Sequence, residues 1–157
     1  MRRLLSSIAV LVCCGLASTF GSTAAAAATT SDAPLVTYTA VNGAIPQSLT
    51  GVPGDPAKGK AVVLDRKLGN CLACHHMPLA APFQGNLGPD LAGVGSRLSA
   101  GQLRLRIADP KLINPATIMP GYYQVAGLHD VAKKFVGKPI LTAQEVEDVV
   151  AYLLSLK

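Results

Sequence analysis

The clearest periodic pattern in the chain lies near its C-terminus. Residues 142–145 have the spacing of a capping box, in which a hydroxyl and a carboxylate satisfy the first free amides of a helix. Apolar side chains then recur at three- and four-residue intervals, as on one face of a helix. They are Val146, Val149, Val150, Leu153 and Leu154. The pattern predicts a helix that packs this face against an earlier helix.

Two weaker patterns predict helices earlier in the chain. Residues 55–67 open with an acidic N-cap and a proline at the first helical position. Residues 99–108 open with a second capping-box spacing and stop before Pro110. In this second helix we expect two apolar side chains to face the core and two arginines to face solvent: Leu103 and Ile107 inward, Arg104 and Arg106 outward.

The remaining segments are rich in glycine and proline and predict loops. Residues 77–97 form a long loop of this kind. Residues 29–54 carry few charges and three prolines, which predicts an irregular N-terminal extension outside the main domain. The expected organisation is therefore an all-α fold in a single domain over residues 55–157.

The first 28 residues have the pattern of a secretory signal peptide. Two arginines precede a short apolar run, and small residues lead to a cleavage site near Ala28. We expect export to the periplasm by the general secretory route. A single membrane anchor, or a lipoprotein site at Cys13 or Cys14, is the alternative. No later segment has the 18 or more consecutive apolar residues of a membrane span.

Composition limits what the chain can do by itself. It has four Tyr, three Phe and no Trp, so it has few large side chains with which to build a core. A non-protein group inside the domain would make up the shortfall. The net charge of +5 is mild and includes no clustered basic face, which argues against binding nucleic acid. No phosphate-binding glycine motif is present.

Residues 71–75 carry the candidate chemistry, with the sequence Cys-Leu-Ala-Cys-His. On a helix, Cys71, Cys74 and His75 would face the same way. This spacing is typical of c-type haem attachment, in which two thiols bond to the porphyrin and the imidazole binds the iron. A thioredoxin-like dithiol would need a βαβ pattern, zinc would need further ligands, and a disulfide would leave the histidine unexplained. The sequence therefore predicts one covalent haem c.

Met119 is the candidate for the second axial ligand of the iron. Pro120 favours an extended backbone at Met119, which suits a ligand held in a stiff loop. The alternatives are that Met119 is only a core residue, or that His129 is the ligand. Met77 is too close to His75 in sequence to reach the opposite haem face, and His76 points away from His75 on a helix.

The order of helix, haem motif, loop, methionine and helix resembles the monohaem class I cytochromes c. Within that class the chain is similar to the SoxX subunits of SoxAX cytochromes. The segments that carry this likeness are residues 45–59, 65–75, 85–91 and 108–120. The resemblance implies that Cys71 and Cys74 anchor the haem and that His75 and Met119 bind its iron.

The resemblance also implies a role in sulfur oxidation. SoxX subunits pair with SoxA, a monohaem or dihaem cytochrome whose haem has a modified cysteine ligand. The pair joins thiosulfate to a cysteine of the SoxYZ carrier, and SoxX passes the electrons to a small soluble cytochrome c. The sulfur chemistry would belong to the partner. A free-standing monohaem electron carrier, or a haem-binding sensor with an open iron position, remains the alternative.

Overall fold

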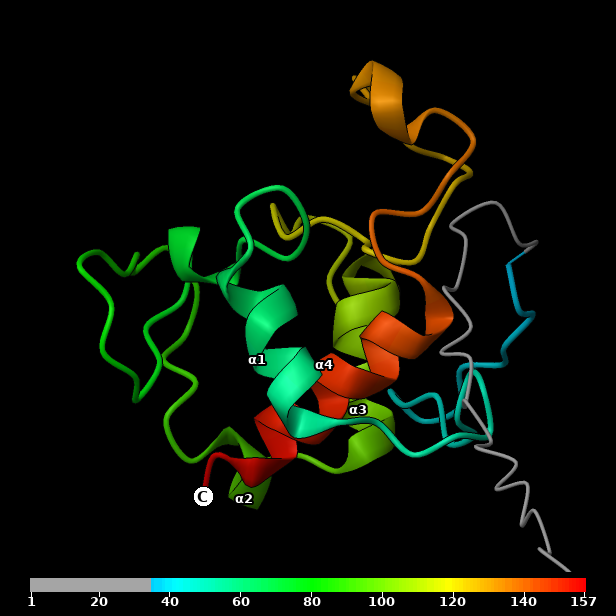
Figure 1. The fold of residues 1–157 in the computed structure, drawn as a ribbon. Helices are drawn as coiled ribbons and strands as arrows, with labels where there is room; N and C mark the ends of the chain where they lie inside the picture. Colours follow the sequence, from blue (N-terminus) through cyan, green and yellow to red (C-terminus); the bar gives the residue numbers. More distant parts are fainter. Residues whose placement is uncertain (1–34) are drawn as a thin grey trace, which may run out of the picture.

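The computed structural model describes residues 35–157, so the predicted signal peptide at 1–28 lies outside the described part. The fold is all-α, and between 35 and 157 the only β pairing is an isolated bridge between Val41 and Ala44 (Figure 1). Three short 3-10 turns accompany the helices. The elements are α1 (Pro56–Leu64), η1 (Cys71–Ala73), α2 (Val94–Arg97), α3 (Ala100–Ala108), η2 (Pro110–Leu112), η3 (Lys133–Phe135) and α4 (Ala143–Ser155).

Helix α4 forms the centre of the fold, with α1 and α3 packed against it. The predicted capping box at Thr142 is present, and four of the five predicted apolar residues are buried, with Leu154 half-buried. The backbones of α1 and α4 pack closely together, because a Cβ on Gly59 of α1 would lie 1.9 Å from the carbonyl oxygen of Asp148 on α4. Only glycine permits this contact. Helix α1 ends at Leu64, three residues before the predicted Lys67.

Helix α3 begins with the predicted capping box, and Leu103 and Ile107 are buried as expected. The outward orientation predicted for Arg104 is wrong. Its side chain is buried, and its Nε and Nη2 donate to the two carboxylate oxygens of Glu147 on α4 at 2.7 and 2.8 Å. This paired geometry satisfies a charge that would otherwise be costly to bury. Arg106, also predicted to face solvent, is half-buried.

The described part of the N-terminal extension contributes to the core. Ile45 and Leu49 are buried. The Ile45 carbonyl accepts a hydrogen bond from Arg104 Nη1 at 2.7 Å, and the Leu49 amide donates to Glu147 Oε1 at 2.8 Å. The extension is therefore irregular, as predicted, but it is fastened to α3 and α4. The predicted domain boundary at residue 55 stays a prediction.

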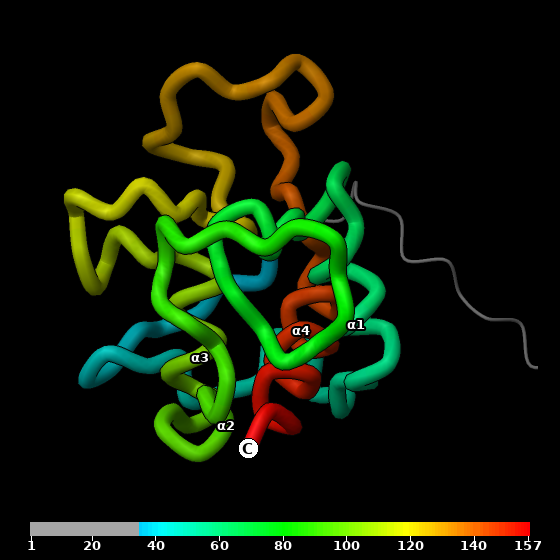
Figure 2. The backbone as a smooth tube through the Cα atoms, turned by 90° about the vertical axis from the view of Figure 1, so that its left-hand side faces the viewer, coloured from blue at the N-terminus to red at the C-terminus, as the bar shows by residue number. Residues whose placement is uncertain are grey.

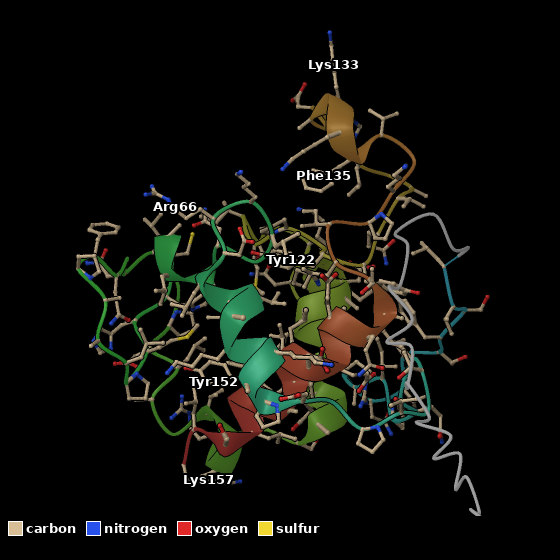
Figure 3. The ribbon with its side chains drawn as sticks, in the orientation of Figure 1. Arg66, Tyr122, Lys133, Phe135, Tyr152 and Lys157 are labelled. Carbon is tan, nitrogen blue, oxygen red and sulfur yellow. The ribbon has the colours of Figure 1, made fainter. Side chains whose placement is uncertain are left out.

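Two long loops complete the fold (Figure 2). One follows η1 and returns to α2, and the other connects α3 to α4. Within the second loop, η3 projects from the helical body with Lys133 and Phe135 (Figures 1 and 3). Over residues 35–157 no helix combines the length and apolar character needed to cross a membrane.

Candidate haem site

A cavity of about 440 Å³ lies between the two long loops and helices α3 and α4. Its walls are mostly apolar and include Leu103 and Ile107 of α3 and Val149 and Leu153 of α4. Three of the four predicted site residues line this cavity: Cys71, His75 and Met119. Cys74 is half-buried and does not line it. The fold thus places Cys71 and Met119, which are 48 positions apart in the sequence, in the wall of the same cavity.

The cysteine segment forms a single tight turn, where the sequence suggested a helix. Asn70 precedes it in a left-handed conformation, with φ of 47°. The Cys74 and His75 amides both donate to the Cys71 carbonyl, at 3.1 and 2.9 Å. This one turn suffices to place Cys71 and His75 on the same side. Because the Cys71 thiol is buried in apolar surroundings, its pKa is raised to about 12 and the thiol is neutral.

The orientation of the His75 ring is fixed by the loop that follows. His75 Nδ1 lies 2.8 Å from the Pro89 carbonyl oxygen. A carbonyl can only accept, so Nδ1 carries the proton and Nε2 keeps a lone pair that can bind a metal. A hydrogen bond of this kind orients a ligating histidine and increases its basicity.

Gly88 makes room for this ring. A Cβ added at Gly88 would lie 2.4 Å from His75 Cε1 and 2.7 Å from Nδ1. The loop is held in place by the Gly88 amide, which donates to the Cys74 carbonyl at 2.8 Å. The backbone of the loop therefore packs directly against the imidazole. The sequence placed Gly88 and Pro89 in the loop of residues 77–97 and in the segment 85–91 of the family resemblance, but it gave neither residue a role beside His75.

Met119 lies in the loop between η2 and the core residue Tyr122. Its side chain is half-buried, and its amide donates to Thr117 Oγ1 at 3.2 Å. Tyr122 is buried, and its hydroxyl donates to the Gly69 carbonyl at 2.7 Å. This bond ties the methionine loop to the turn that precedes Cys71. Burial raises the pKa of Tyr122, so its hydroxyl stays a donor.

The alternative iron ligands separate into two groups. His129 and His76 are exposed and do not line the cavity, and His76 Nδ1 instead lies 3.0 Å from Asp90 Oδ2. Met77 is buried and does line the cavity. Its amide donates to Gln84 Oε1 at 2.6 Å, which fixes its backbone in the loop after His75. The structure therefore leaves Met119 and Met77 as the thioether groups beside the cavity.

The residues present fit a haem. Apolar walls suit the porphyrin plane, Cys71 offers a thiol, and His75 and Met119 offer the nitrogen and sulfur groups that bind haem iron. Arg97 and Arg106 also line the cavity, and their guanidinium groups would offer positive charge to the propionates of a bound haem. The sequence prediction that Arg106 points to solvent missed this position.

Comparisons with known proteins agree with this geometry. The sequence model of the cytochrome c family matches residues 56–157. A crystal structure of SoxXA from P. pantotrophus contains a chain that is 40% identical, with a TM-score of 0.71, and the match covers 76% of this chain and 94% of that one. No curated protein sequence matches. The chain therefore belongs to the cytochrome c family, as a SoxX-type cytochrome with covalent haem c in an all-α class I fold.

Proposed function

We propose that this chain is the electron-transfer subunit of a periplasmic SoxAX cytochrome. In this proposal Cys71 and Cys74 anchor the haem through thioether bonds, and His75 and Met119 are the axial ligands of its iron. The observation that carries the proposal is that the His75 imidazole and the Met119 side chain open into the same apolar cavity, beside Cys71. The haem, when bound, supplies a centre that gains and loses one electron at a time.

The residues around the cavity suit an electron relay. Pro89 holds the His75 ring with Nε2 available, so the ligand needs no reorientation between oxidation states. A methionine ligand raises the reduction potential of a haem relative to a second histidine. The apolar walls from α3 and α4 exclude water, which favours the less charged reduced state of the iron. Filling both axial positions leaves no site for a substrate.

The proposed partner is a SoxA-like cytochrome with one or two haems. The crystal structure that this chain resembles is described as SoxXA. Both cysteines of the described chain are assigned to the haem, so the sulfur site would lie on the partner. There the thiol of the SoxYZ carrier and thiosulfate would form a new S–S bond, releasing one proton and two electrons. This subunit would relay those electrons singly to a small soluble cytochrome c.

Export is the second part of the proposal. Residues 1–28 would be removed as a signal peptide during secretion to the periplasm, where haem is attached to the reduced thiols. The mature chain would then form a heterodimer with the SoxA-like subunit. The enzymatic label for the complex, an L-cysteine S-thiosulfotransferase, would describe the partner's site.

The test uses the full chain, co-expressed with a SoxA-like cytochrome. After purification through a tag on this chain, we expect a two-protein complex whose haem is reduced when thiosulfate and SoxYZ are both added. Omitting either reactant, or using the isolated subunit, should leave the haem oxidised. A lone monomer that cycles reversibly and captures no second haem protein would support the free-standing carrier. Strong carbon monoxide binding to the reduced protein would support the sensor.

A further inference from the structure

We propose that residues 36–38 form a strap that positions Met119 by holding the base of its loop closed. The Met119 loop is defined here as residues 109–124. This inference rests on the proposed role of Met119 as an iron ligand. The strap belongs to the irregular N-terminal extension, far from the haem motif in sequence, and it contacts the last two residues of the loop.

The Met119 loop is closed at its base and exposed at its tip. Gln124 Nε2 donates to Asp109 Oδ2 at 3.0 Å, which links the last residue of the loop to the first. The Tyr122 and Tyr123 amides donate to the Ile107 and Ala108 carbonyls at 3.0 and 3.2 Å. By contrast, Leu112 and Ile118 in the tip are 60% and 79% exposed. The tip has little packing of its own, so its position depends on the base.

The strap adds three contacts to that base. The Val36 amide donates to the Tyr123 hydroxyl at 2.8 Å, and Gln124 Nε2 donates to the Tyr38 hydroxyl. The rings of Tyr38 and Tyr123 also pack at a centroid distance of 6.5 Å. Burial, and next the Asp109 carboxylate, raise the pKa of Tyr38, so its hydroxyl stays neutral. The Gln124 amide is thus held between Tyr38 and Asp109.

The strap should lower the fraction of molecules in which Met119 is dissociated from the iron. A dissociated methionine requires the loop to shift, and the strap opposes a shift at residues 123 and 124. A small external ligand such as imidazole can bind only when Met119 is away, so its apparent affinity scales with that fraction. Loosening the strap should therefore strengthen imidazole binding.

The test compares Tyr38→Phe, Tyr123→Phe and the double variant as loaded cytochromes. Each keeps the ring and removes one hydroxyl. We expect imidazole to bind about threefold to tenfold more tightly in each single variant, as expected for the loss of one hydrogen bond. The double variant should bind more tightly still. The long-wavelength absorption band of the methionine–iron bond should weaken in the same order. The Tyr122 and Tyr123 amides should exchange hydrogen faster.

Tyr152→Phe is the matched control. Tyr152 lies on α4 against Gly59 of α1, away from the strap contacts. It should leave imidazole affinity and the absorption band unchanged. Wild-type affinity, absorption band and amide exchange in the double variant would overturn the strap. Met119→Ala separates this failure from that of the proposed ligand: it should bind imidazole most tightly of all, and wild-type affinity in that variant would refute Met119 as the ligand.

Discussion

Gly88→Ala tests whether the backbone beside His75 sets the ligand geometry. The added Cβ would lie 2.4, 2.7 and 2.9 Å from three atoms of the imidazole, about 1 Å inside normal contact. The ring and the loop must therefore move apart. The carbonyl oxygen of Pro89, the next residue, accepts a hydrogen bond from His75 Nδ1 at 2.8 Å, so that movement also breaks the orienting hydrogen bond. Overpacking and the lost bond together cost about 2–4 kcal/mol.

Two measurements on the loaded cytochrome check this prediction. The free energy of unfolding should fall by about 2–4 kcal/mol. If His75 is the iron ligand, imidazole should also bind more tightly, because the displaced ring would hold the iron less well. Gly127→Ala is the control. Gly127 has open space around it but a φ of +70°, so alanine should cost about 1 kcal/mol through backbone strain without affecting the haem spectrum. A Gly88→Ala protein with wild-type stability and spectrum would refute the packing argument.

Three further replacements test the site and its support. Met119→Ala should lower the reduction potential and open the iron to carbon monoxide, measured by redox titration and absorption spectra; an unchanged potential would assign the ligand elsewhere. Cys74→Ala should leave one thioether bond, so denatured protein analysed by mass spectrometry should show singly attached haem. A normal yield of doubly attached haem would contradict the anchor assignment. Glu147→Gln should cost about 3–5 kcal/mol in chemical denaturation, because the Arg104 charge remains buried with half its carboxylate pairing lost. Little change would mean that water reaches Arg104.

The features that could be predicted from the sequence are those with local causes. The capping boxes at Ser99 and Thr142 each lie within four residues, and both helices begin where predicted. The start of α1 at Pro56 was equally local. Its end differs by three residues from the prediction, because the Asp65 amide donates to the carbonyls of Ala61 and Val62 and the chain then turns. The Asp65 carboxylate fixes that turn by accepting from the Lys67 amide at 2.7 Å.

The features that were missed depend on residues far apart in the chain. Arg104 looked like a surface residue on its own helix, but its partner Glu147 is 43 positions away. Ile45 looked like part of a loose extension, yet it is buried because its backbone pairs with Gly101 and Arg104. At the site, the cysteine motif was recognisable from five residues. The support of His75 by Pro89, 14 positions on, required the folded loop.

The size and the apolar lining of the cavity predict that bound haem contributes to the stability of the fold. Without the haem, apolar side chains of α3, α4 and the two long loops would face water, which is unfavourable. A domain of this size is stable by only about 5–15 kcal/mol in total. The mostly apolar walls of the cavity also offer few hydrogen-bond partners to water. Helices α3 and α4 line the cavity and also form the core. Movement of the two long loops into the cavity would therefore disturb the packing of the core. The haem would therefore take the place of the large aromatic side chains that the sequence lacks, and, if Cys71 and Cys74 are its anchors, replacing either cysteine should lower the stability of the fold as well as the yield of attached haem.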